Sequence, residues 1–348
     1  MMFAHHFFTF PTWWTDGINY PFIRNLAPYF CDPLKLCVPV FCFLTGYFYF
    51  YNKDKSYLYS ARKITDILID YWCVLLLLAV LSAITIHYVY TPVGFLKEMF
   101  ALERPTMVFC WYVCFYYTFM LLLPLLTKLL SKGVHRDLFF STILFPTFIW
   151  IIRYIIIKHG AGKTIVNILW YFAWWFPAVL VGYIFANYNI FDRMEYNSKN
   201  TCSKKKAVFL WVIVGLCVPM GRYFLPSFSL NIGSLPIFHE SMIIKLSLDF
   251  VYAPVFIYCL VNLCRAIKWV HMQFILKEVG KNSLMMWFVS CIFFNNSKKV
   301  FQPILYCPHN PVLVLIWGLC VCYIISALLN FGLHTIKKQK NKILFHKV

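Results

Sequence analysis

The stretch ITDILIDYWCVLLLLAVLSAITIHYVY, residues 64–90, decides the fold class, because it is an apolar run long enough to cross a membrane. A helix needs roughly 20 apolar residues to span the hydrocarbon layer of a bilayer. The runs are continuously apolar rather than alternating, which excludes a transmembrane β-barrel. The sequence therefore predicts an all-α, polytopic transmembrane helix bundle of about nine helices. The eight further runs cover residues 34–51, 107–128, 137–157, 165–186, 207–225, 242–263, 283–295 and 312–333.

The composition agrees with this fold class. Of the 348 residues, 61% are hydrophobic and 13% are charged. Soluble domains average about half apolar and about a quarter charged residues, so a soluble core could not bury this much apolar surface. We expect one integral membrane domain over residues 1–348, with an extracytoplasmic segment at 1–33, the helices and their loops at 34–333, and a tail at 334–348.

The basic residues predict the orientation. Roughly two thirds of the 32 Lys and Arg residues fall on the side that holds Lys53, Lys128, Lys204 and the tail, and the positive-inside rule makes that side cytoplasmic. An odd number of spans then places Met1 outside, which predicts a misassigned start or a missing first helix. The net charge of +19 is spread over several inner connections, so we attribute it to topology and anionic lipids rather than to a nucleic-acid partner.

Four blocks follow one another along the chain: VPVFCFLTGYFYF at 38–50, Trp111-Tyr112 with Pro124, WFPAVLVGYIFA at 175–186, and GKNSLMMWF at 280–288. In this order they resemble the acyltransferase-3 family of multi-spanning membrane acyltransferases, over nearly the whole chain. The resemblance implies ten helices with both ends cytoplasmic, which fits the expectation that one helix is missing here. The chain departs from the family pattern at Ser290, where many members have His.

The adjacent His5 and His6 are the candidate catalytic residues. A neutral imidazole can take the proton from a sugar hydroxyl as it attacks an acyl carbon, because its pKa lies near the working pH. The resemblance adds that family members carry a His thought to be catalytic after an Arg on the first helix. Here the Arg position would lie before Met1. Without that context, two adjacent histidines are weak evidence for catalysis, and interfacial or loop histidines are the favoured interpretation.

The resemblance also implies that Arg62 and Lys63 receive the phosphates of an acyl-CoA donor. Basic side chains at the cytoplasmic opening of a helix bundle suit that role. The same two residues could instead set topology and meet lipid headgroups. Both interpretations stay open.

The candidate acceptor residues are polar or aromatic side chains near the outer face. Charges inside apolar runs are expensive and are usually functional or paired. Arg153, Glu240 and Asp249, together with His239, could line a polar cavity for the acceptor sugar; alternatively, Lys245 neutralises Asp249 at i, i+4 spacing. Trp13 and Trp14 could stack on a sugar ring or belong to the interfacial aromatic belt.

We therefore predict a membrane O-acyltransferase that moves an acetyl or similar short acyl group from acyl-CoA, with acetyl-CoA as the expected donor, to a hydroxyl of a cell-surface or lipid-linked glycan. No metal ligand spacing is evident, and this chemistry needs no metal. The expected partners are the donor, the glycan and membrane lipids, and the expected location is a bacterial plasma membrane with a cytoplasmic C-terminus. The alternatives are a polysaccharide-unit transporter or flippase and a non-catalytic membrane partner.

Overall fold

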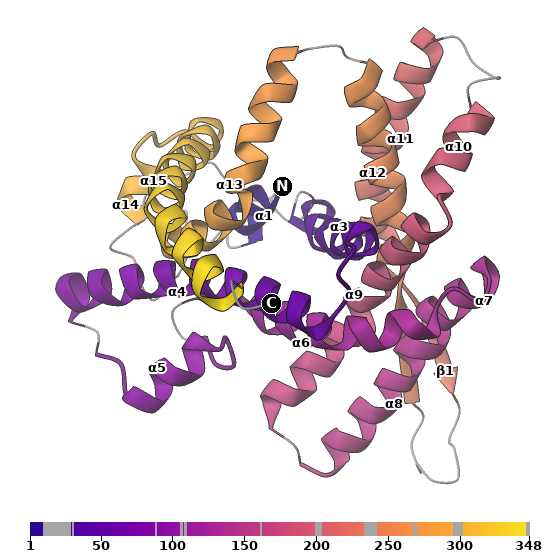
Figure 1. The fold of residues 1–348 in the computed structure, drawn as a ribbon. Coiled ribbons are helices and arrows are strands. Elements are labelled where there is room, and N and C mark those ends of the chain that lie inside the picture. Colours follow the sequence, from indigo (N-terminus) through magenta and orange to yellow (C-terminus); the bar gives the residue numbers. More distant parts are fainter. Residues whose placement is uncertain are drawn as a thin grey trace. The chain divides into compact units, whose positions relative to one another are not determined.

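The computed structural model describes residues 1–9, 29, 31–87, 89–104, 107, 110–160, 162–198, 204–232, 242–266, 270–294 and 302–345 (Figure 1). The chain divides into two compact units. Unit 1 comprises Met1, Asp32–Ser60 and Thr118–Trp269, and unit 2 comprises Met2–Cys31, Ala61–Tyr117 and Val270–Val348.

Unit 1 is a helical bundle with one β-hairpin. Its core joins α3, α9 and α12 through buried Phe43, Val181, Ala253 and Ile257. The hairpin pairs β1 with β2 antiparallel, in the register Ser227 to Ser247. Its elements are α3 (Cys37–Tyr51), α7 (Val134–Phe139), a π-helical turn (Phe140–Leu144), α8 (Phe145–Lys158), α9 (Lys163–Asn187), α10 (Ile190–Ser198), α11 (Lys204–Phe224), β1 (Ser227–Ile232), β2 (Met242–Ser247) and α12 (Asp249–Ala266).

Helices α3 and α9 pack closely because two glycines face each other's backbone. A Cβ added at Gly46 would lie 1.8 Å from the carbonyl oxygen of Val179, and one added at Gly182 would lie 2.0 Å from that of Phe43. Small residues allow helix backbones to approach in this way within a membrane. Both glycines belong to the blocks at 38–50 and 175–186, so the spacing of these helices explains the small residue in each block.

Replacing Gly46 or Gly182 by Ala should lower the free energy of unfolding by about 3 kcal/mol or more, at the upper end of overpacking effects. The added methyl group meets backbone atoms, so the clash can be relieved only by separating the two helices. Equilibrium denaturation in detergent measures the change. The control is Gly215→Ala in α11, where the nearest atom to a new Cβ is Cys259 Cβ at 3.9 Å. Equal stability of Gly46→Ala and the control would contradict the close packing.

Unit 2 contains two long helices, α13 and α15, that pack along each other, and the Asn330 amide donates to Asn282 Oδ1 at 2.8 Å between them. Tyr71 of α4 packs edge-on against Phe288 of α13. The elements are α1 (Met2–Thr9), α4 (Tyr57–Ile86) from residue 61, α5 (Pro92–Met99), α6 (Trp111–Leu126) to residue 117, α13 (Val270–Phe294), α14 (Gln302–Tyr306) and α15 (Pro311–Phe345).

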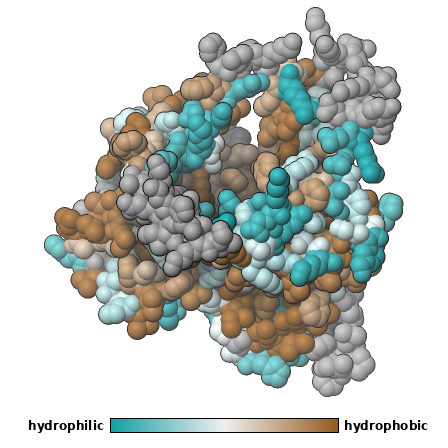
Figure 2. Space-filling model, in the orientation of Figure 1, coloured by the Kyte–Doolittle hydropathy of each residue, from teal (hydrophilic) through white to brown (hydrophobic). Residues whose placement is uncertain are grey.

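The helices have the length and surface of membrane spans. Among the described residues, seven helical segments are long and apolar enough to cross a bilayer, and Val208–Phe224 is a shorter apolar helix. Large apolar side chains such as Ile84, Phe224 and Phe331 are exposed, and Figure 2 shows apolar residues over broad parts of the surface in view. The prediction of an all-α polytopic bundle is confirmed.

Each of the nine apolar runs contains a helix, but the boundaries differ from those predicted. The helix predicted over 242–263 is wrong in its first part, since Met242–Ser247 forms β2 and the helix begins at Asp249. Alternation explains the strand: Ile244 and Leu246 are buried while Ile243 and Lys245 are exposed. The run 283–295 belongs to α13, a helix of 25 residues that begins earlier, at Val270; it is not one of the seven segments that are both long and apolar enough to cross a bilayer.

Candidate active site

The two candidate catalytic histidines lie on α1, a short helix that packs against α13 and α15 within unit 2. Phe3 anchors this helix, because its side chain is buried and meets the Phe294 ring edge-on at 5.0 Å. His5 and His6 are themselves buried, at 9% and 4% exposed. Burial of imidazoles on an anchored helix fixes their orientation, as a catalytic base requires.

His5 has a defined tautomer. Its Nδ1 lies 2.8 Å from the carbonyl oxygen of Cys31. A carbonyl oxygen can only accept, so we assign the proton to Nδ1, which donates it; Cys31 Sγ lies farther from this nitrogen, at 3.6 Å. In the neutral ring the lone pair is then on Nε2, which makes Nε2 the atom that can take a proton from a hydroxyl. The backbone carbonyl plays the orienting part that a carboxylate plays in other base assemblies.

His6 is a different kind of histidine. Its ring centroid lies 5.5 Å from that of His5 and 6.0 Å from that of Phe294. Burial, and secondarily the charge of His5 when that ring is protonated, hold the pKa of His6 well below its ordinary value. His6 therefore stays neutral at neutral pH, and it does not add a positive charge beside His5.

The packing of α1 against α15 depends on Gly318 of α15. A Cβ at this position would lie 2.3 Å from Phe3 Cζ and 2.6 Å from Leu305 Cδ1. The Gly318→Ala variant should therefore displace Phe3 and α1, and a shift of about 1 Å at a reacting group can cost roughly 10²-fold in rate. We expect kcat for the acyl transfer predicted from the sequence to fall by about one to two orders of magnitude, with little change in KM for the donor.

The matched control for that variant is Gly332→Ala on the same helix, where a new Cβ meets no atom of the described residues within 4 Å. Ala is the better helix former, so the control should keep the parental rate and gain up to about 1 kcal/mol of stability. A parental kcat in Gly318→Ala would show that the packing of α1 against α15 does not affect the rate of the reaction.

The family model described as an acyltransferase domain, that of the acyltransferase-3 family, matches residues 1–331. The chain belongs to the acyltransferase-3 family. This membership and the apolar helices make it an integral membrane acyltransferase. No curated protein and no solved structure matches the chain.

The two residues of this acyltransferase that are proposed to bind the acyl-CoA donor lie at the start of α4. Arg62 and Lys63 occupy the second turn of that helix, with Arg62 half-buried and Lys63 exposed. The helix begins at Tyr57 rather than near residue 64, so the two cations are held on helical backbone instead of in a loop. Adjacent residues on a helix point about 100° apart, so one can face the protein while the other faces solvent.

Asp249 has a partner that the sequence analysis missed. Arg222 Nε lies 2.6 Å from Asp249 Oδ1 and Nη2 lies 3.2 Å from Oδ2, which forms a buried bidentate ion pair. The predicted Lys245–Asp249 pair is wrong, because Lys245 lies in a strand and its side chain is exposed. Arg222 lies at the end of the apolar run 207–225, so the rule that buried charges are paired could have identified it.

Arg153 connects two helices of the acyltransferase. Its Nε donates to the Val166 carbonyl of α9 at 3.3 Å, and its guanidinium lies 5.1 Å from the centre of the Trp150 ring. Trp150 in turn donates to the Lys245 carbonyl at 2.8 Å. These contacts stabilise the join of α8, α9 and β2, and a role in acceptor binding stays a prediction.

Three further candidates cannot be placed. Trp13, Trp14 and Glu240 lie outside the described residues, as does His239. Ser290, at the departure from the family pattern, is buried in α13 and donates to the Trp287 carbonyl at 2.6 Å. This hydroxyl is thus used within its own helix.

A buried carboxylate in unit 2 was also missed. Glu98 is fully buried at the end of α5, and its Oε1 accepts from the Met107 amide at 2.7 Å. The carbonyl of Glu98 accepts from the Tyr71 hydroxyl at 2.8 Å. These bonds fix the connection between α5 and α6 against α4. No pattern in the sequence points to this residue, since Glu98 lies outside the apolar runs.

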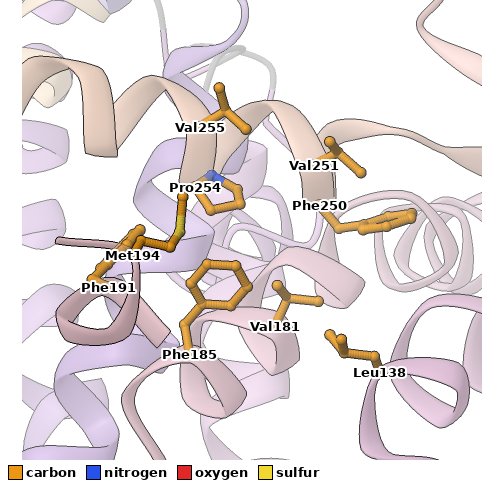
Figure 3. A pocket seen from close by; sticks show the side chains of 9 residues that line it. All are labelled: Leu138, Val181, Phe185, Phe191, Met194, Phe250, Val251, Pro254 and Val255. Carbon is orange, nitrogen blue, oxygen red and sulfur yellow. The ribbon is translucent and has the colours of Figure 1, made fainter. Parts of the chain in front are cut away.

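An apolar pocket of about 220 Å³ lies in unit 1 among α7, α9, α10 and α12. Figure 3 shows side chains from these elements converging on it. The lining consists of Leu138, Val181, Phe185, Phe191, Met194, Phe250, Val251, Pro254 and Val255. Such a lining accommodates apolar groups and supplies no acid, base or nucleophile, so the histidines of α1 are the better candidates for the chemistry.

Proposed function

We propose that this membrane acyltransferase moves an acetyl group from acetyl-CoA to a hydroxyl of a cell-surface or lipid-linked glycan, with His5 as the general base. The observation that carries the proposal is the hydrogen bond from His5 Nδ1 to the Cys31 carbonyl, which leaves Nε2 as the proton acceptor. Family membership supports the acyl-transfer class. A similar short acyl group, such as succinyl, would follow the same chemistry.

The proposed reaction balances in protons and electrons. Nε2 of His5 removes the proton from the acceptor hydroxyl while that oxygen attacks the thioester carbonyl. The tetrahedral intermediate then expels the coenzyme A thiolate as the ester forms. The imidazolium returns its proton to the thiolate. The products are the O-acyl glycan and free coenzyme A, with His5 neutral again.

The two substrates meet opposite constraints. Acetyl-CoA carries several phosphate charges and stays in the cytosol, so Arg62 and Lys63 are the proposed phosphate ligands. The glycan lies on the other side of the membrane in the orientation that the positive-inside rule predicts, with a cytoplasmic C-terminus and a bacterial plasma membrane as the proposed location. Arg153 and Asp249 are proposed to support acceptor placement. No metal takes part in these steps.

Radiolabelled acetyl transfer tests this function. The full chain in proteoliposomes is supplied with acetyl-CoA labelled in the acetyl group and with glycans extracted from bacterial membranes. We expect chain-dependent label in a hydroxylamine-sensitive ester, and loss of that label in a His5→Ala/His6→Ala variant. Equal labelling by the parent and this variant would remove the histidine base. Glycan movement across the vesicle membrane without any ester product would favour a transporter instead.

A further inference from the structure

A second cavity of unit 1 lies where α3, α9 and α11 come together, and its lining is unlike the apolar pocket. It measures about 160 Å³. Two charged residues come from the turn before α3, two tryptophans from α9, and a cation from the last turn of α11. The lining residues are Asp32, Lys35, Trp170, Trp174, Arg222, Tyr223 and Pro226.

Arg222 is held rigidly at this cavity. Two of its nitrogens bind the Asp249 carboxylate, and Nη1 donates to the backbone carbonyl of Asp32 at 2.8 Å. A guanidinium has five N–H donors, and these bonds use three of them. Among the described residues the other two donors have no further partner, and the side chain is 4% exposed and lines the cavity. The arginine is therefore a fixed donor for a ligand and need not be reoriented on binding.

The cavity is close to neutral in charge. The Asp249 carboxylate neutralises the charge of Arg222. The other charged lining residues are Asp32, which is negative, and Lys35, which is positive. A simple anion would be attracted by Lys35 and repelled by Asp32, and a simple cation would meet the reverse. A neutral ligand with several hydroxyl groups can donate to the Asp32 carboxylate and accept from Lys35 and Arg222 at the same time.

The aromatic side chains add a flat apolar wall. Trp170 and Trp174 stand one turn apart on α9, and their rings are stacked with centroids 5.5 Å apart and planes 22° apart. Both are half-buried, so part of each ring is accessible. A pocket with aromatic walls and a few fixed polar groups is the usual form of a small-molecule site. The C–H face of a pyranose ring fits such a wall while its hydroxyls reach the charged groups.

We propose that this cavity binds one neutral pyranose unit, stacked on the Trp170–Trp174 pair and hydrogen-bonded by Asp32, Lys35 and Arg222. The volume corresponds to about five water molecules at roughly 30 Å³ each, which is enough for one sugar ring and too small for an oligosaccharide. The inference rests on the proposed function in one respect: the bound ring would be a unit of the glycan acceptor.

Saturation-transfer NMR tests the site directly, on the full chain in lipid nanodiscs with no acyl donor present. The probes are methyl β-glucopyranoside, N-acetylglucosamine, glucuronate and phosphoethanolamine. We expect transfer to the ring protons of the two neutral sugars, with dissociation constants in the millimolar range. Signal from glucuronate or phosphoethanolamine with none from the neutral sugars would overturn the proposal, and would point to an anion site or a lipid-headgroup site.

Two variants locate the signal. Trp174→Ala removes stacking surface, and Asp32→Asn removes the carboxylate while keeping the backbone carbonyl that binds Arg222. Each should weaken sugar binding by about tenfold, the effect of losing one charge-assisted hydrogen bond or one stacking contact. The control is Trp317→Ala, an exposed tryptophan of α15 that should leave the signal unchanged. Parental binding by both variants would overturn the site.

The outcomes for the two proposals are separable. Sugar binding by a chain that transfers no acyl group supports this site and overturns the proposed reaction. Acyl transfer to a glycan at parental rate and KM in both Trp174→Ala and Asp32→Asn overturns this site and leaves the reaction standing.

Discussion

Replacing Arg222 by Ala should lower the free energy of unfolding by about 3–5 kcal/mol, because it leaves the Asp249 carboxylate buried without its bidentate partner. The loss also includes the bond from Nη1 to the Asp32 carbonyl, which ties α11 to the turn before α3. Both side chains are at most 5% exposed, so water cannot replace the lost contacts. Equilibrium denaturation in detergent, followed by the loss of the monodisperse folded species, measures the change.

A double variant separates the destabilisation caused by the unpaired Asp249 charge from that caused by the lost packing of Arg222. Arg222→Met with Asp249→Leu removes both charges and fills the space with apolar atoms, so it should recover most of the stability lost in Arg222→Ala. The exposed pair Lys97–Glu103, at 2.7 Å, is the matched control, and Lys97→Ala should cost less than about 1 kcal/mol. An Arg222→Ala loss no larger than that of Lys97→Ala would mean that the ion pair is not buried in the folded protein.

The fold class could be predicted because it depends on composition and run length. A helix that satisfies its own backbone is the simplest solution for a continuous apolar run in a bilayer, whatever it packs against. Every predicted run therefore contains a helix. The sequence blocks that contain Gly46 and Gly182 carry the family resemblance, and the backbone contact of α3 with α9 is the physical reason for the two glycines.

The hairpin and the partner of Asp249 depend on contacts that sequence spacing does not contain. The strand residues SFSLNI, 227–232, alternate polar with apolar. The first six residues of the apolar run 242–263 also form a strand, which its apolar composition alone does not distinguish from the helix that follows. Arg222 and Asp249 stand 27 positions apart and meet only through the packing of α11 on α12. The i, i+4 spacing offered Lys245 as a partner, whereas the tertiary packing gives the carboxylate of Asp249 a bidentate contact with Arg222.

For the histidine pair, too, one part could be predicted from the sequence and another part depends on a tertiary contact. The sequence identified both rings as candidates but could not choose between them, because adjacent residues have the same chemistry. The proposal of His5 as the base rests on the Cys31 carbonyl, which lies 26 positions from His5 and accepts a hydrogen bond from its Nδ1. No spacing rule predicts a hydrogen bond from a ring to a distant main-chain oxygen.

The His5→Gln variant should reduce the rate of acyl transfer at saturating donor by about 10²–10⁴-fold, the usual contribution of a positioned general base. The glutamine amide can still donate to the Cys31 carbonyl, so the local fold is kept while the proton acceptor at Nε2 is lost. His6→Gln should have a much smaller effect on the rate, since His6 serves as a buried neutral neighbour. Initial rates of ester formation from labelled acetyl-CoA provide the measurement.

The control for both variants is His135→Gln, which changes an exposed histidine of α7 and should keep the parental rate. Denaturation midpoints of the three variants should agree with that of the parent, so that a lost rate reflects lost chemistry. A His6→Gln variant that loses as much rate as His5→Gln would contradict the tautomer argument, because the two rings would then act as one unit. A parental rate in His5→Gln would contradict it outright, since a glutamine cannot accept the hydroxyl proton.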